Sequence, residues 1–276
     1  MKHMVCLGLL SLWMVANPAY AQAESTGPAN GTLLLTGGGK VKPGSVLDTF
    51  LELAGGEGSR ILYIRIPPGL PENVGNLSKY EAILSKRFRA SVTVLHSNHR
   101  DDWDSEAFAG AIAASNAVWI GGGSQGHLAY MILDTRSHTE LEALLQRGGV
   151  LAGQSGGAMI VGSFMLRGSP DKPALIARGH TRGFGFLHNV VINPHLTEHN
   201  RENQLVTAVD LYPDLLGIGI DEDAAIVVEK NMFRIVGHGR VVIYDNKLHG
   251  SQWFYDLNPN AIFDLGTRTV RPPNQH

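Results

Sequence analysis

Cysteine is almost absent from this sequence: Cys6 is the only one among 276 residues. It lies in an N-terminal segment that we expect to be removed, which would leave the mature chain without a thiol. Such a chain forms no disulfide, has no cysteine nucleophile and binds no metal through sulfur. We expect no cofactor and no metal.

An excess of one charge sign is also lacking. Lys and Arg number 23 against 25 Asp and Glu, giving a formal net charge of -2. Without a basic excess to neutralise phosphates, we expect no nucleic-acid partner. Charged residues make up only 17% and hydrophobic residues 43%, a composition that excludes intrinsic disorder.

No run of about 20 apolar residues, the length needed to span a membrane, occurs anywhere. Residues 5–16 form a shorter apolar run after a basic start, followed by a small-x-small site at 19–21. This pattern is typical of a secretory signal peptide. We therefore predict a signal peptide at residues 1–21, one domain at 22–276, no membrane span, and a secreted or periplasmic bacterial protein.

Short apolar runs alternate with helical patterns along the first half of the domain. Runs that are apolar throughout indicate parallel strands covered on both faces, so we predict an α/β three-layer sandwich with a mostly parallel central sheet. The predicted strands are 32–36, 60–66, 91–95, 117–120 and 150–152, and the helices 78–88, 105–114 and 141–147.

The later chain predicts an antiparallel extension at one edge of this sheet, because its apolar runs are joined by tight turns. These runs are 216–220, 224–229, 232–236 and 240–245; a short apolar run at 190–192 and a helix at 201–211 precede them. Residues 167–183, rich in Gly, Pro, Asp and Arg, are expected to form a surface loop.

The most informative motif is Gly153-Gln154-Ser155-Gly156-Gly157, which fits G-x-S-x-G between a predicted strand and the helix-compatible run 158–161. That context is the one a nucleophile elbow requires, with the hydroxyl above the strand end. The Gly156 amide can then face a developing oxyanion. The alternative is a Gly-rich turn whose serine only caps the helix.

A serine nucleophile needs a base and a group to orient that base. His195 follows the apolar run 190–192, at a strand end where ligands gather in open α/β sheets. Three acids at 221–223 follow the run 216–220, and one of them can turn inward to hold an imidazole. The order Ser, His, acid differs from the Ser, acid, His order of α/β-hydrolases.

Three segments carry a resemblance to the cyanophycinase and peptidase E group of serine peptidases. Residues 150–158 resemble the nucleophile segment, residues 217–225 (GIGIDEDAA) resemble cyanophycinase most specifically, and residues 122–125 (GGSQ) are similar to a GG-x-Q loop. The resemblance implies a glutamine-amidotransferase-like α/β sandwich, often dimeric, so that a homodimer is possible. It implies Ser155 as nucleophile, His195 as general base, Glu222 as its partner, and an oxyanion site near Gly123 and Gly156.

The resemblance also implies a peptide or poly-amino-acid substrate, with Gln125, Asn193, His199 and Arg201 in its binding site. The sequence departs from the group here: Asn193 replaces an acid, and His199 and Gln204 replace arginines that help to hold a β-Asp-Arg substrate. Changing Arg to a neutral residue removes bidentate carboxylate recognition. The catalytic residues of the group are therefore matched better in this sequence than its substrate-binding residues. The expected substrate is cyanophycin or another peptide or isopeptide.

Two alternatives remain. Residues 195–199 (HLTEH) fit H-x-x-E-H, an inverted zinc-peptidase motif in which His195 and His199 would share one face of a helix. The glycine runs 37–39 and 121–123 follow predicted strands, where they could cradle an anion in a non-catalytic secreted ligand-binding module.

Overall fold

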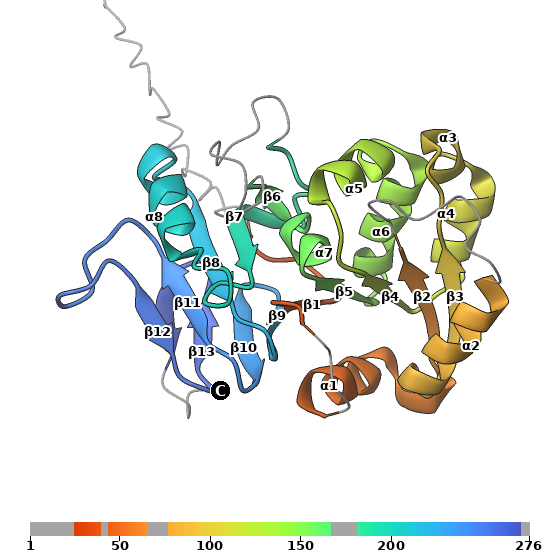
Figure 1. The fold of residues 1–276 in the computed structure, drawn as a ribbon, viewed down its shortest axis with the longest axis horizontal. Coiled ribbons are helices and arrows are strands. Elements are labelled where there is room, and N and C mark those ends of the chain that lie inside the picture. The colour runs from red at the N-terminus through yellow and green to blue at the C-terminus, as the bar shows by residue number, and fades with distance from the viewer. Residues whose placement is uncertain (1–24, 40–43, 66–76, 167–180, 272–276) are drawn as a thin grey trace, which may run out of the picture.

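The computed structural model describes residues 25–39, 44–65, 77–166 and 181–271 (Figure 1). The predicted signal peptide and most of the predicted loop at 167–183 lie outside these residues. Five parallel strands form one half of a nine-stranded central sheet, in the order β1, β5, β4, β2, β3. They are β1 (Thr32–Thr36), β2 (Arg60–Ile64), β3 (Ser91–Leu95), β4 (Ala117–Ile120) and β5 (Val150–Gln154).

Both faces are buried at the inner strands β1, β4 and β5, which is why these read as continuous apolar runs, whereas the edge strand β3 exposes Ser91 and Thr93. In β1, Leu33 and Leu35 join the core on one face and Leu34 joins the core on the other. Figure 1 shows helices on either side of the sheet. One face packs against α1 (Ser45–Ala54) and α2 (Leu77–Phe88), with the 3-10 turn η1 (Gly56–Gly58) after α1. The other packs against α3 (Arg100–Trp103), α4 (Glu106–Ala113), α5 (Gln125–Ile132), α6 (Arg136–Gln146) and α7 (Gly156–Met159).

The other half of the central sheet is antiparallel and continues beyond β1. It runs through β9 (Ala224–Glu229), β10 (Met232–Gly237), β13 (Ile262–Asp264) and β14 (Thr269–Arg271). The predicted mixed α/β fold, with a large, mostly parallel sheet and antiparallel strands, is thus confirmed.

A second sheet of five strands was not predicted. Its order is β12 (Tyr255–Leu257), β11 (Val241–Tyr244), β8 (Leu216–Ile220), β7 (Leu187–Pro194) and β6 (Gly162–Phe164), with β6, β7 and β8 parallel. Its inner side chains share a core with β9 and β10, and α8 (Glu202–Leu211) covers its outer face. The runs 216–220 and 240–245 therefore belong to this sheet and not to the edge of the central one. Strands buried on both faces have the same sequence pattern in either sheet.

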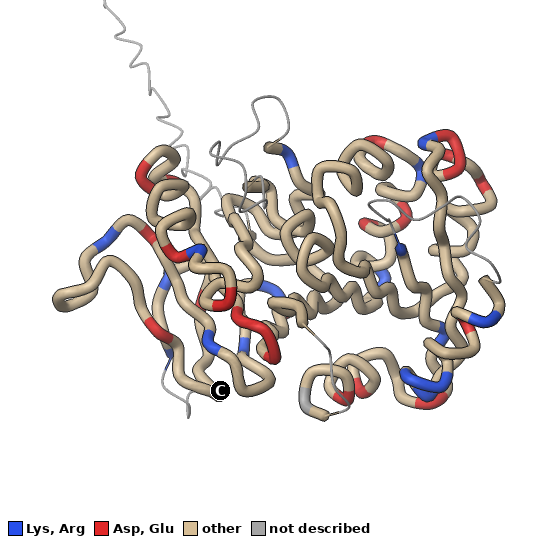
Figure 2. The backbone as a smooth tube through the Cα atoms, in the orientation of Figure 1, with Lys and Arg blue, Asp and Glu red and all other residues tan. Residues whose placement is uncertain are grey.

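Within the described ranges, no helix is long and apolar enough to cross a membrane. Basic and acidic residues are interspersed over the backbone (Figure 2).

Candidate active site

The site forms where the carboxyl ends of several strands meet. Parallel neighbours bring these ends to one edge of a sheet, where ligands bind in open α/β folds. The end of β1 joins the parts: the Ser155 amide donates to the Thr36 carbonyl at 3.1 Å, and the His195 amide donates to the Gly37 carbonyl at 3.2 Å. The backbones that carry the serine and the histidine are therefore both fixed to the same strand end.

Ser155 occupies a strained turn between β5 and α7. Its φ of 54° and ψ of -117° lie outside the regions that non-glycine residues favour. Such a conformation costs about 1–3 kcal/mol and persists where the surrounding structure imposes it, often at functional sites. The geometry agrees with the sharp elbow predicted from G-x-S-x-G.

Three side chains far apart in the sequence form one hydrogen-bonded chain here. Ser155 Oγ lies 2.8 Å from His195 Nε2, and His195 Nδ1 lies 2.8 Å from Glu222 Oε1. The His195 side chain is 13% exposed and that of Glu222 is 39% exposed. The structure thus brings the three sequence-predicted residues together in the connectivity of a serine–histidine–acid triad.

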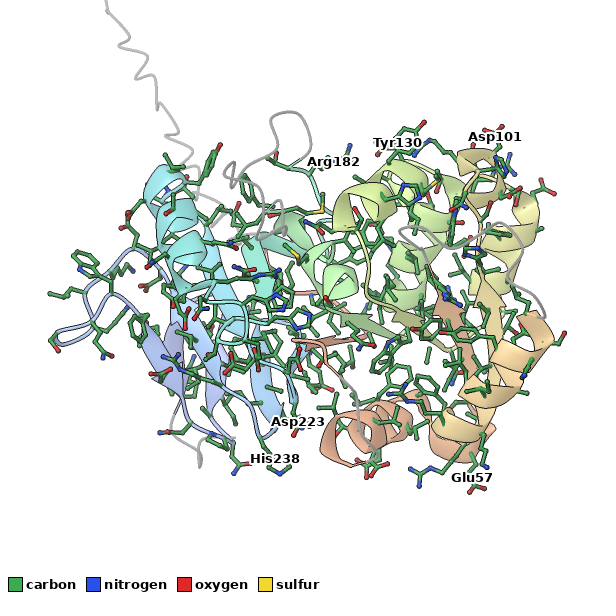
Figure 3. All side chains as sticks on the ribbon, viewed as in Figure 1. Glu57, Asp101, Tyr130, Arg182, Asp223 and His238 are labelled. Atoms are coloured by element: carbon green, nitrogen blue, oxygen red, sulfur yellow. The ribbon has the colours of Figure 1, made fainter. Side chains whose placement is uncertain are left out.

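The three acids after β8 divide into separate tasks, which their position alone left open and for which the family resemblance implied Glu222. Asp221 accepts hydrogen bonds from the Thr197 amide at 2.9 Å and the Thr197 hydroxyl at 3.1 Å. Glu222 holds the imidazole, whereas Asp223 lies 3.4 Å from His238. Figure 3 shows this last pair together at one edge of the molecule.

The glycine pattern of β8 explains how the histidine turn fits against its strand. A Cβ atom on Gly219 would lie 2.6 Å from Cδ2 of Leu196, the residue that follows His195. Real Cβ contacts are not that short, so any larger residue at 219 would displace the Leu196 side chain from its present position over the strand. Leu196 is fully buried there and fixes the start of the turn that carries His195.

Gly38 and Gly39 are site residues that the sequence analysis missed. A Cβ on Gly38 would lie 2.4 Å from Cε1 of His195, and one on Gly39 would lie 2.4 Å from Oε2 of Glu222. The Gly39 carbonyl accepts from the Gln154 side chain at 3.0 Å. The glycine run after β1 is the signal for them; its sequence suggests an anion cradle, but in the structure these two residues make room for the imidazole and its carboxylate.

The two predicted oxyanion residues lie side by side next to the serine. A Cβ on Gly156 would be 2.1 Å from the Gly123 carbonyl oxygen. A Cβ on Gly122 would be 3.3 Å from Cβ of Ser155. The loop after β4 therefore passes directly beside the elbow.

The predicted substrate residues differ in exposure. Gln125 is buried and donates to the Leu166 carbonyl at 2.8 Å. Asn193 is fully buried, with its amide 3.1 Å from Gln204 Oε1, and Arg201 is buried and donates to the Pro194 carbonyl at 3.0 Å. Burial argues against direct substrate contact for Asn193 and Arg201, whereas His199 is exposed.

The predicted helical zinc motif is not formed. Residues 195–200 make a turn, not a helix, and the rings of His195 and His199 are stacked at 4.8 Å between centroids and 15° between planes. Both nitrogens of His195 are engaged by Ser155 and Glu222, and Glu198 Oε1 accepts from the Glu222 amide at 3.0 Å. In the part of the chain that the structure describes, no group of three or more His, Cys, Asp or Glu side chains could hold a metal ion.

Comparison with known proteins gives the same class as the fold and the site. The chain is 32% identical to the cyanophycinase of Trichormus variabilis over 230 residues, covering 80% of this chain and 76% of the relative. It is 29% identical to the cyanophycinase of Synechococcus elongatus over 244 residues, covering 85% and 75%. A crystallised peptidase from an acI-B1 actinobacterium shares the fold, with a TM-score of 0.65, 24% identity, and coverage of 87% of this chain and 98% of that one.

This chain is therefore a serine-type peptidase built on an α/β sandwich. The model of peptidase family S51 matches residues 33–236, most of the described chain, and the chain belongs to that family. Membership in a hydrolase family disfavours the alternative of a non-catalytic binding module.

Proposed function

We propose that this protein hydrolyses peptide or isopeptide amide bonds through an acyl-enzyme on Ser155. The single observation that carries the proposal is the hydrogen-bonded chain from Ser155 through His195 to Glu222, with 2.8 Å at each link. The strained conformation of Ser155 supports it, because strain at a strand end is typical of a nucleophile elbow.

In this proposal the Ser155 oxygen attacks the amide carbonyl carbon while its proton passes to Nε2 of His195. Glu222 accepts from Nδ1–H, which fixes the tautomer and stabilises the imidazolium. The amides of Gly123 and Gly156 would donate to the tetrahedral oxyanion. The C–N bond then breaks, and His195 protonates the departing amine.

Water completes the cycle. The water oxygen attacks the ester carbonyl while His195 takes a proton from that water. The bond between Ser155 and the acyl group then breaks, and His195 returns the proton to the serine oxygen. This order of steps uses the three side chains, the two backbone amides and water.

The proposed substrate is a peptide or a poly-amino acid. Because the relatives are cyanophycinases, cyanophycin is the first substrate to test, with β-Asp-Arg dipeptides as the expected products. His199 stands at the open side of the site, while Gln125, Asn193 and Arg201 would act through the loops that they hold. A homodimer stays a prediction, to be checked by analytical ultracentrifugation.

We also propose that the protein is exported, on the support of the apolar run at 5–16 and the small-x-small site at 19–21. The mass of the protein recovered from the periplasm or medium of a bacterial host should match a chain that begins at Gln22. Recovery of the uncleaved chain in the cytoplasm would contradict export.

The test of the activity compares wild-type protein with Ser155→Ala on cyanophycin, β-linked aspartyl dipeptides and ordinary α-linked peptides. At least one amide should be cleaved, and loss of the nucleophile should reduce the rate on the order of 10⁶-fold, as in other triads. Equal cleavage by the Ser155→Ala protein would exclude the serine mechanism, and the bond that is cut defines the substrate class.

A further inference from the structure

The ring of His199 packs flat on the ring of His195. Their centroids are 4.8 Å apart and their planes differ by 15°. The backbone sets this pairing, because the His199 amide donates to the His195 carbonyl at 3.1 Å and so closes one turn over four residues. His195 opens this turn with a φ of 51°, outside helical geometry, so the pairing of the two rings belongs to this turn and not to a helix.

The turn that carries His199 is fixed to the same loop that supplies the triad acid. Thr197 donates twice to Asp221, and Glu198 accepts from the Glu222 amide at 3.0 Å. The backbone that leads directly into His199 is therefore tied to the loop that carries Glu222.

The triad hydrogen bonds hold the imidazole only at its edge. Both bonds of His195 are made in the ring plane, at Nε2 and Nδ1, and neither contacts the ring face. A parallel ring packed against that face resists the tilting and out-of-plane displacement that would misalign both bonds. The hold by Glu222 is also partly open to water, since that side chain is 39% exposed.

A neutral His199 ring is compatible with its position against the general base His195. Burial against its neighbours, and next the positive charges of Arg201 and His195, lower the pKa of His199, while Glu222 and Glu198 act in the opposite direction. A lowered pKa keeps the ring neutral at pH 7. A neutral ring does not oppose the positive charge that His195 gains when it takes the serine proton, whereas a cation 4.8 Å away would.

We propose that His199 is a positioning residue that holds the plane of the His195 ring by stacking. This inference rests on the proposed function of Ser155 and His195. It adds a role that is distinct from substrate contact, because His199 acts on the reaction only through the general base.

The experiment measures how fast a fluorophosphonate probe labels Ser155, across pH, in wild-type protein and three variants. The probe needs the nucleophile and its base but no particular peptide. We expect His199→Ala to slow labelling about tenfold, since the ring loses its support. His199→Phe, which restores the stack, should label within about twofold of wild type. His199→Arg, which adds a permanent charge, should move the acid limb of the profile about one pH unit lower.

His188→Ala is the matched control, an exposed histidine at the other end of β7, and it should behave as wild type. Equal labelling of His199→Ala and wild type would overturn the inference. So would a His199→Phe variant as slow as His199→Ala, or variants that change only KM for a cleaved peptide. Wild-type protein that labels no faster than Ser155→Ala would instead refute the proposed function itself.

Discussion

A methyl group on Gly38 tests whether the loop after β1 fits the imidazole as closely as the structure indicates. In Gly38→Ala, the new Cβ would lie 2.4 Å from Cε1 and 2.6 Å from Nε2 of His195. Carbon contacts relax to about 3.5 Å, so the ring or the loop has to move by roughly 1 Å. The ring is held at both nitrogens, and its displacement would lengthen the bond to Ser155.

The size of the effect follows from two separate costs. Gly38 has a φ of 113°, where an alanine is strained by about 1–2 kcal/mol, which lowers the melting temperature by roughly 2–8 °C in a protein of this size. Misplacing a catalytic group by about 1 Å reduces rates about 10²-fold. Gly44→Ala separates the two costs, because Gly44 has a φ of 136° and open space where the Cβ would lie.

The assay is the rate of fluorophosphonate labelling at Ser155, located by peptide mass spectrometry, beside thermal melts of both variants. Gly38→Ala should label about 10²-fold more slowly than wild type, and Gly44→Ala within about twofold, with similar losses of melting temperature. If Gly38→Ala labels as fast as Gly44→Ala, the close fit of the loop to His195 does not exist.

Three further predictions follow from the site and the core. Gly219→Ala should destabilise the fold by about 1–3 kcal/mol in urea unfolding, and Leu196→Ala in the same chain should restore part of this loss; simple additivity would contradict the predicted clash. Glu222→Ala should slow labelling of Ser155 about 10²–10³-fold, whereas Asp223→Ala should label within about twofold of the wild-type rate. Equal effects would refute the division of tasks. Burial lowers the pKa of His138 below 6.5, so the folded state binds fewer protons than the unfolded state at that pH. Stability should thus fall as pH drops from about 6.5 towards the folded pKa, and His138→Gln should flatten urea midpoints across that window; an unchanged slope would contradict this.

The parallel half of the fold could be predicted because burial on both faces leaves a continuous apolar run in the inner strands, and because the edge strand β3 alternates exposed Ser91 and Thr93 with buried valines. β1, β3 and β4 have the predicted bounds, and β5 extends two residues further, to Gln154. Sheet membership could not be predicted for β8, because Ile218 and Ile220 alternate with glycines that pack against α8 and Leu196 in the second sheet. That contact is a tertiary one, with no local signature.

The serine and the histidine of the site could be predicted because few residues of these types directly follow a predicted strand. A serine between glycines at a strand end and a histidine after another strand end are few enough to single out, and the structure brings them together. The choice among three adjacent acids depended on hydrogen bonds to Thr197 and His238, and the stacking of His199 depended on a turn that sequence spacing favours as a helix. Both are set by backbone geometry.

Labelling of Ser155 in wild-type, Ser155→Ala and His195→Gln proteins tests the central claim most directly. The account predicts one phosphonyl group per wild-type chain on the peptide that contains Ser155, none at that peptide in Ser155→Ala, and labelling at least about 10³-fold slower in His195→Gln. An adduct that forms at the wild-type rate without the imidazole at 195, or that sits on another residue, would contradict it.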